Sequence, residues 1–451
     1  MDGERVRLAS PGLRPGGTGW MVYWMQQAQR ASWNHALEFS IRKSGELGVP
    51  LIVFFCLDPD YPGASRRHFA FMIEGLVETA RELAGRGLTL VLSTGDPVDR
   101  FVSVCGGAAA AVTDGGHSPV QKRWRAEASS RCPCPFYIVE TDTLAPPEQI
   151  YPRRAWSAAV LRRHIESVVE GALDPPARET VRFPGFVPDV ESMDPREVLA
   201  SMAPGEGSAD NLLPEPGASA ALERLSAFIG EKLGSYGAKA RDPVANCVSG
   251  LSPYMHFGQI SPLEVAWRVR RAGGPGAPAF LEQLLVRREL AVNYCAFSTS
   301  PGEWRSIPDW ARSTLEEHSR DTREYIYSRD EFAGAGTHDA AWNAAQRELV
   351  LTGTMHGYMR MYWGKMILAW SASPREAFET AVHLNDSYAL DGRDPNGYAG
   401  VAWCFGLHDR PWPERPVFGK VRSMTGRRLR ERFDMGGYIG RIDALEKGGT
   451  G

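Results

Sequence analysis

Three kinds of segment are missing from this sequence of 451 residues. No stretch of about 18 consecutive apolar residues occurs, so no segment is predicted to span a membrane as a helix. Neither a Gly-x-Gly-x-x-Gly motif nor a Walker loop occurs, so no standard phosphate-binding loop indicates a nucleotide. The formal net charge is only −3, so binding to nucleic acid would have to depend on a local basic patch.

Cysteine is scarce, and its spacing is poor for a metal. There are seven cysteines, and only Cys132 and Cys134 are close in sequence, separated by one residue. A structural zinc site or an iron–sulfur cluster needs a fuller set of ligands, so we expect no metal site. An odd number of scattered cysteines favours free thiols and a cytoplasmic location. The first residues have no apolar core like that of a signal peptide, and we predict a flexible tail over residues 1–19.

Short apolar runs alternate with helical patterns over residues 20–172. The runs are "WMVYWM", "LIVFFCL", "LTLVLS", "AAAAVTD" and "FYIVE", and amphipathic segments such as "RRHFAFMIEGLVETARELAG" lie between them. Buried strands alternating with helices are typical of βαβ units in a parallel sheet. We therefore predict a doubly wound α/β domain, which binds ligands at the carboxyl ends of its strands.

Residues 173–219 are rich in Pro, Gly, Ser and Asp and lose all periodicity, as in "APGEGSADNLLPEPGAS". This is longer than an ordinary connection, so we predict an interdomain linker that wraps the surface. From residue 220 to residue 451 nearly every segment has helical spacing, for example "AFLEQLLVRRELAVNYCAF". The second domain is predicted to be all-α.

The segment "MHGYMRMYWGKMILAW", residues 355–370, carries an arginine in a helix that is apolar on most of its circumference. Such a helix is predicted to be buried. An unpaired guanidinium there would cost several kcal/mol, so Arg360 needs an anionic partner. Asp391 and Asp394, in the turn-rich segment "LNDSYALDGRDPNGYAGVAW", are plausible counter-ions.

Three other features have both a structural and a functional interpretation. Trp363 and Trp370 are seven residues apart on one helix and Trp342 is on the preceding helix, which suits either three core side chains or a chain of redox-active rings. The segment "VSGLSPYMHFGQIS", from Val248 to Ser261, has small hydroxyl residues at helix starts, which suits phosphate binding or ordinary capping. Glu289 lies in an apolar helix next to two arginines, so it is either salt-bridged or a carboxyl with a raised pKa.

Taken together, "LSPYMHFGQIS", "VRREL", "WNAAQRELVLTGTMHGYMRMYWGKMILAW" and "LDGRDPNGYAGVAWCFGLHDRPWPERPVFGKVR" resemble the class II cyclobutane pyrimidine dimer photolyases. The resemblance spans roughly Gly19 to Phe433 and is weaker in the α/β half. It implies an antenna-type α/β domain followed by a helical domain that binds FAD. In that family, blue light excites FADH⁻, which passes an electron to a flipped-out pyrimidine dimer in ultraviolet-damaged DNA, and the dimer splits.

The resemblance also implies roles for individual residues. For the flavin it implies Tyr236, Val248, Ser249, Gly250, Leu251, Ser252, Arg360, Asn385, Asp391 and Asp394. Glu289 would bond the dimer's carbonyl, and Met359 or Met361 and Trp403 would wall the flipped bases. Trp342, Trp363 and Trp370 would pass electrons from the surface to oxidised flavin. Arg410, Arg415, Lys420 and Arg422, in a basic segment, would contact DNA phosphates, with an ordinary solvated face as the alternative.

Three other functions share parts of this pattern. A cryptochrome-like photoreceptor has the same fold and FAD but lacks the substrate-side residues, which are present here. Repair of (6-4) photoproducts depends on active-site histidines, and His356 beside Arg360 has no matching partner. A light-independent flavin module would leave the tryptophan series without a purpose. An antenna chromophore, a deazaflavin or a flavin, is implied only by the fold and has no assigned residues. We expect association with the nucleoid through DNA and no obligate protein partner.

Overall fold

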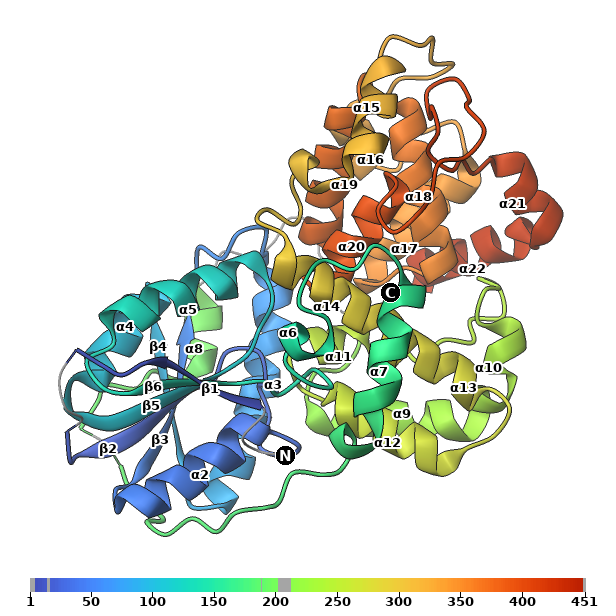
Figure 1. Ribbon diagram of the computed structural model, residues 1–451. Helices are drawn as coiled ribbons and strands as arrows, with labels where there is room; N and C mark the ends of the chain where they lie inside the picture. Colours follow the sequence, from blue (N-terminus) through green and yellow to red (C-terminus); the bar gives the residue numbers. More distant parts are fainter. Residues whose placement is uncertain (1–4, 14–16, 188, 202–211, 449–451) are drawn as a thin grey trace.

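Six strands of the N-terminal part form a single sheet in the computed structural model (Figure 1). The structure describes residues 5–13, 17–187, 189–201 and 212–448. The strand order is β1-β6-β5-β2-β3-β4, with β2 to β6 parallel and β1 antiparallel to β6. The strands are β1 (Val6–Ser10), β2 (Trp20–Trp24), β3 (Leu51–Leu57), β4 (Thr89–Thr94), β5 (Ala108–Asp114) and β6 (Phe136–Val139).

Helices cover both faces of this sheet, because alternate residues of each buried strand point to opposite sides. On one face Tyr23 and Val53 belong to the same apolar cluster as Leu76 of α3, and on the other Phe54 clusters with Phe101 of α4. The four covering helices are α2 (His35–Leu47), α3 (Arg66–Gly85), α4 (Pro97–Val104) and α5 (Pro119–Arg131). The predicted doubly wound α/β domain is confirmed.

The predicted flexible tail is wrong for Val6–Ser10, which forms the edge strand β1. The exposed side of β6 offers unpaired backbone groups, and the short strand satisfies them. Buried Arg5 holds this segment in place by donating to the carbonyl oxygens of Thr143 (2.8 Å) and Leu144 (2.7 Å). Proline and glycine on the C-terminal side of the strand obscured it in the sequence. Residues 1–4 and 14–16 of the predicted tail lie outside the described residues.

The predicted domain boundary at residue 172 also needs correction. Helices α6 (Pro147–Ile150) and α7 (Ala158–Ala172) lie among the helices of the second domain (Figure 1). Leu161 and Ile165 of α7 are buried in the same cluster as Leu225 and Phe228, which come from the C-terminal half of the chain. The apolar face of α7 packs against apolar residues of the helical domain, because both faces of the sheet are already covered by other helices.

The predicted linker returns to the α/β domain. Gly185 donates its backbone N–H to Gly87 (2.9 Å), and Met193 donates to Leu92 of β4 (2.9 Å). The linker also contains the short helix α8 (Pro195–Ser201), which packs against α3. Residue 188 and residues 202–211 of the predicted linker lie outside the described residues.

The second domain is helical, as predicted, and begins at Ala218. Its helices are α9 (Ala218–Ala227), α10 (Leu233–Lys239), α11 (Ser252–His256), α12 (Pro262–Ala272), α13 (Ala277–Leu281), α14 (Arg288–Phe297), α15 (Asp309–Glu317), α16 (Arg329–Ala333), α17 (Ala340–Thr352), α18 (Gly357–Trp370), α19 (Pro374–Tyr388), α20 (Pro395–Cys404), α21 (Gly426–Arg432) and α22 (Met435–Gly448). Among the described residues, no helix is both long and apolar enough to cross a bilayer.

Arg30, which is 1% exposed, ties the two domains together. Its guanidinium pairs with Asp142 at 2.5 Å and donates to the backbone carbonyl of Gly258 in the helical domain at 3.0 Å. A buried charge of this kind is tolerated only when it is paired. The pair therefore sets the position of the carboxyl edge of the sheet relative to the helical domain.

Candidate functional site

Arg360 of α18 meets Asp391 of the α19–α20 turn, at 3.0 Å between Nη2 and Oδ1. The ion pair is partly buried, with side-chain exposures of 20% and 13%. A guanidinium has five N–H donors, and within the described chain no other hydrogen-bond partner of this guanidinium is found. The predicted neutralisation of Arg360 by an aspartate is confirmed for Asp391, and the arginine keeps donors for a second anion.

Asn385 lies next to this pair and is 2% exposed. Its amide Nδ2 donates to Asp386 at 3.1 Å, and it packs against Gly397 of α20. A Cβ atom at Gly397 would lie 2.9 Å from that amide nitrogen, so only glycine leaves the amide where it is. The turn-rich segment therefore brings Asn385 and Asp391 together, as predicted.

Asp394, the other candidate counter-ion, does not pair with Arg360, and its predicted place beside the flavin stays a prediction. It caps α20 by accepting from the N–H of Asn396 (2.8 Å), and its other oxygen lies 3.3 Å from Nδ1 of His256. Burial favours the neutral acid, but the hydrogen bond and the charge of His256 hold the pKa of Asp394 below its ordinary value. Two residues of turn, Gly392 and Arg393, separate Asp394 from Asp391, which is enough to direct the two carboxylates to different partners.

The predicted phosphate loop, residues 248–252, lies at the start of α11. Leu251 is buried in the helical core, whereas Ser252 is exposed and Val248, Ser249 and Gly250 are partly buried. Gly250 has φ +67°, and a Cβ there would lie 2.6 Å from Nη1 of Arg224. Arg224 is thus a cation at this loop that sequence reasoning missed. Tyr236 of α10 is partly buried and packs edge-on against Phe228 and Phe280.

The three predicted tryptophans form a continuous row. Trp342 is stacked on Trp363, with ring centroids 6.4 Å apart and planes within 5°, and it lies 6.3 Å from Trp370. Its indole N–H donates to the carbonyl of Trp363 at 3.1 Å, which locks the stack. The order in space is therefore Trp363, Trp342, Trp370, although Trp342 comes first in the chain.

The row does not end at the surface with Trp370, which is only 8% exposed. Tyr327 and His338 continue it, at 6.1 Å and 4.7 Å from the Trp370 ring. The Tyr327 hydroxyl and Nδ1 of exposed His338 lie 2.8 Å apart. Sequence reasoning missed both residues, because neither lies on a helix that carries a tryptophan of the row.

Trp403 and Met361 are the partly exposed members of the predicted substrate wall. Met359 is fully buried in the helical core, so Met361 is the accessible member of the predicted pair. The guanidinium of Arg287 lies over the Trp403 ring, 5.5 Å from its centroid. The partly exposed indole of Trp403, with the Arg287 cation against it, therefore offers a flat surface on which bases can stack.

Glu289 is 3% exposed and accepts a hydrogen bond from the N–H of Leu144 at 3.1 Å. Leu144 belongs to the loop after β6, so this carboxyl lies at the junction of the two domains. Burial raises the pKa of Glu289 to about 7, although Arg288 and the Leu144 N–H oppose the shift. Glu289 therefore has features of both interpretations, since it lies 3.9 Å from Arg288 Nη1 and has a raised pKa, and its contact with a substrate stays a prediction.

The four predicted phosphate contacts are exposed on one surface hairpin, residues 409–422, closed by the bond from Arg415 N–H to Gly419 O (3.0 Å). Arg422 and Arg410 flank the ring of Trp412 at 5.0 Å and 6.0 Å. No carboxylate of the described residues forms an ion pair with Arg410, Arg415, Lys420 or Arg422. Trp412, itself 38% exposed, was missed, and its signal was an aromatic residue between prolines in a basic segment.

A cleft lies between the two domains, at the carboxyl ends of β2 and β3. Its lining is mostly apolar and aromatic, with Tyr61 and Trp124 from one domain and Phe257 from the other. Arg393, 3% exposed, reaches across and bonds Gly63 O at 3.2 Å. The sheet's strand order reverses direction beside this cleft, between β2 and β5, where α/β sheets bind ligands.

Comparisons with known proteins agree with this arrangement. A sequence profile of the DNA photolyase family matches residues 21–180. The chain is 43% identical over 448 residues to a deoxyribodipyrimidine photo-lyase of Methanothermobacter thermautotrophicus, covering 98% of each protein. It is 37% identical to a deoxyribodipyrimidine photo-lyase of Oryza sativa subsp. japonica, covering 98% of this chain and 91% of that protein.

Solved structures show the same fold. The chain superposes on a bacterial class III photolyase from Agrobacterium tumefaciens with a TM-score of 0.72 at 20% identity, covering 94% of this chain and 86% of the other. The TM-score is also 0.72 for the cryptochrome of Synechocystis sp. PCC6803, at 15% identity, with 93% and 88% covered. At these identities the likeness concerns the fold alone.

The raised pKa of Glu289 predicts a pH-dependent effect of Glu289→Gln. The folded state holds the proton up to about pH 7, whereas the unfolded chain loses it near pH 4.3, so wild-type stability falls as the pH rises between these values. Glutamine mimics the neutral acid and removes this loss. The free energy of unfolding of the variant relative to wild type should therefore increase from pH 4 to pH 8, by up to about 3 kcal/mol.

Urea unfolding of both proteins across this pH range measures the difference. A difference that stays constant with pH would show that Glu289 is ionised throughout. Repair assays on Glu289→Gln and Glu289→Ala then address the predicted substrate contact, because a residue that only joins the domains leaves the repair yield of the folded glutamine variant unchanged.

Proposed function

The chain belongs to the family of deoxyribodipyrimidine photo-lyases and is a light-driven DNA repair enzyme, and from that premise we propose that it is a class II enzyme acting on cyclobutane pyrimidine dimers. The class is supported by the motifs around Arg360, Asp391 and Trp403, which resemble those of class II enzymes. Ultraviolet-damaged DNA is the partner that this activity requires.

The Arg360–Asp391 pair is the observation on which the flavin assignment depends. Asp391 neutralises the guanidinium, yet the remaining N–H donors have no partner among the described residues, so an anion beside them would be stabilised. A reduced, anionic flavin ring fits that requirement. Arg360, Asp391 and Asn385 would hold the ring.

The phosphates of FAD fit the other part of the predicted site. Gly250 leaves room for Arg224, and a side chain at this position would displace that cation. We assign Arg224, Ser249 and Ser252 to the phosphates and Tyr236 to the neighbouring ribose. When bound in its reduced form, FAD supplies the light-driven electron transfer that splits the dimer.

The protein's own contribution is a pocket surface that excludes water and on which bases can stack. Damaged bases must leave the duplex to reach a buried site, and a dimer, which is already distorted, costs less to extrude. Met361 and Trp403 would line the pocket for the extruded bases. The Arg287 guanidinium, packed over the indole ring, would hold Trp403 in place. Full burial of Met359 and Trp363 excludes water from the flavin side of α18.

The interdomain cleft is our candidate for the site of a second, light-harvesting chromophore, a deazaflavin or a flavin. The solved archaeal photolyase of Sulfolobus tokodaii, 17% identical with a TM-score of 0.72, is described with two FAD molecules and a novel light-harvesting cofactor. Here Tyr61 and Trp124 offer aromatic faces for a flat ring, and Arg393 offers a charge at one end.

The alternative of a cryptochrome-like photoreceptor has less support, because the curated relatives are all named as photo-lyases. Repair of (6-4) photoproducts, the other alternative, depends on active-site histidines in related enzymes. Burial lowers the pKa of His408 to about 4, so this histidine is uncharged at physiological pH. A cytoplasmic, nucleoid-associated location stays a prediction.

The proposed substrate class is tested with the purified chain, loaded with FAD and chemically reduced. One oligonucleotide carries a cyclobutane thymine dimer, and a matched one carries a (6-4) photoproduct. We expect loss of the cyclobutane dimer under blue light and none in darkness. Loss of the (6-4) lesion instead would overturn the class assignment, and loss of neither would overturn the repair role.

The tryptophan row predicts that Trp363→Phe slows photoreduction of oxidised FAD by an order of magnitude or more. Phenylalanine is much harder to oxidise than tryptophan. Trp363 is the end of the row opposite Trp370, with Trp342 between them. Absorbance changes of the flavin under blue light measure the rate. Trp304→Phe is the matched control, since Trp304 is also buried in the same core but contacts only Phe378 and Phe405 among the described aromatic rings. Equal rates in the two variants would exclude this electron route.

The basic hairpin predicts a salt-dependent loss of DNA binding in Arg422→Gln. Each lost phosphate contact on a duplex should lower the slope of log K against log salt by about 0.9, with damaged and undamaged DNA weakened alike several-fold. Fluorescence anisotropy at a series of salt concentrations measures both. Arg427→Gln is the control, because that exposed arginine already pairs with Glu431 at 3.7 Å. An unchanged slope for Arg422→Gln would place the DNA on another face.

A further inference from the structure

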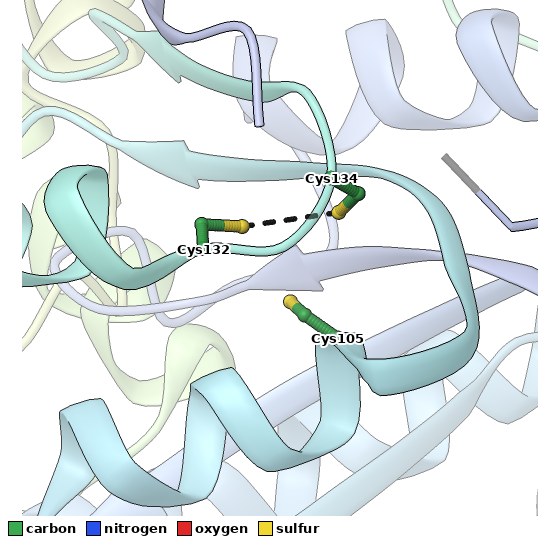
Figure 2. A group of neighbouring side chains, drawn as sticks. All are labelled: Cys105, Cys132 and Cys134. Carbon is green, nitrogen blue, oxygen red and sulfur yellow. Dashed lines mark hydrogen bonds between the residues drawn. The ribbon is translucent and has the colours of Figure 1, made fainter. Parts of the chain in front are cut away.

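Three cysteine thiols converge in the α/β domain, where Cys105 meets the pair Cys132 and Cys134 from a distant part of the chain (Figure 2). Cys105 begins the short turn η1 (Cys105–Gly107) after α4, Cys132 follows α5, and Cys134 precedes β6. All three sulfurs lie within 4.8 Å of one another, and those of Cys132 and Cys134 are 3.8 Å apart. The side chains are 0–1% exposed, and none is in a disulfide.

The spacing in the sequence did not predict this group. Cys132 and Cys134 alone offer two ligands, and Cys105 joins them only because β5 and β6 are neighbours in the sheet. Buried cysteines often serve simply as small apolar side chains. Three of them meeting at one point is a different situation, because each thiol is only a weak hydrogen-bond donor and acceptor.

The sulfur positions suit a single soft ion. Metal–thiolate bonds of about 2.3 Å in a trigonal arrangement place the sulfurs about 4 Å apart. The Cys132–Cys134 separation already has this value, and the third sulfur needs to move by less than an ångström. Thiolate ligands select soft ions such as monovalent copper.

The residues around the three sulfurs determine how many ligands a bound ion would have. No His, Asp or Glu of the described chain joins the three sulfurs, and the group lies in an apolar cluster with Val22, Phe101 and Phe136. A structural zinc ion almost always takes four ligands, and this dry pocket has no fourth. A buried complex must also carry little net charge, since no cation lies beside it to compensate.

We infer that Cys105, Cys132 and Cys134 form a three-sulfur site for one soft, thiophilic ion, with monovalent copper or trivalent arsenic as its occupant. With arsenous acid, three As–S bonds replace three As–O bonds and three water molecules leave, which gives a neutral complex. With monovalent copper, one thiol proton leaves to solvent as the Cu–S bonds form, and the complex of one thiolate and two thiols is also neutral. No electron is transferred in either case.

Binding at this site would fasten the start of β5 to the start of β6. The segment Gly12–Leu13 lies directly over the site, because the Leu13 N–H donates to Cys132 O at 3.3 Å and a Cβ at Gly12 would touch the Cys134 backbone. An ion held only by the folded chain raises its stability by mass action. The consequence is therefore a more stable antenna-type domain, independent of the flavin.

The experiment titrates the full-length protein, with its thiols reduced, with buffered monovalent copper, with arsenite and with zinc in separate series. Native mass spectrometry reads the ions bound per chain, and a thermal melt reads the stability. We expect one copper or arsenic per chain and a higher melting temperature. Cys105→Ala and Cys134→Ala should each lower the affinity by more than about 100-fold, beyond what an outer-shell change costs. Cys295→Ala, which removes a buried cysteine elsewhere, should bind as wild type does.

X-ray absorption on the loaded wild-type protein counts the sulfur neighbours and does not depend on any variant folding. Three sulfurs at one distance support the assignment. Failure of both copper and arsenite to bind, binding that survives loss of Cys105 and Cys134, or equally tight binding of zinc would each overturn it. Comparing the copper and arsenite series identifies which ion the site prefers.

Discussion

Helix α18 is buried on almost every side, and the rest of the catalytic domain is arranged around this constraint. Met359, Tyr362 and Ile367 are fully inaccessible to solvent, so α17, α19 and α20 must pack against the helix from several directions. A polar group on such a helix must find a partner or the helix cannot be buried. Arg360 finds Asp391, and that single ion pair places the α19–α20 turn against α18.

Lys365, the other cation of α18, is also buried and therefore also needs a polar partner. It is 2% exposed and donates to the Cys404 carbonyl at 2.5 Å, at the end of α20. Burial lowers its pKa to about 8, so the ammonium depends on this one carbonyl for compensation. Two charges on one buried helix thus contact the turn before α20 and the last residue of α20, which follows Trp403. The proposed substrate wall and the ion pair proposed to lie beside the flavin are therefore positioned by contacts of the same helix.

The junction of the two domains also depends on buried polar groups that must find partners. Arg30 and Glu289 are both buried there, and each is satisfied by backbone groups of the opposite domain. Asp114, at the end of β5, accepts from the backbone N–H groups of Gln26 and Gln27 at 2.9 Å and 2.7 Å and so shapes the mouth of the cleft. These polar contacts are directional, which makes the relative placement of the domains specific where apolar packing alone would allow sliding.

Periodicity and local chemistry by themselves determined the doubly wound sheet, the helical second domain, the need of Arg360 for an anion and the tryptophans of the row, because these depend on residues near one another in the chain. Only the tertiary structure decided which aspartate pairs with Arg360, that Asp394 and Glu289 face the domain junction, and that β1 exists. It also brought Cys105 to Cys132 and Cys134. Each of these contacts joins segments far apart in sequence, and nothing in the spacing of residues encodes which distant backbone or side chain will occupy the remaining space.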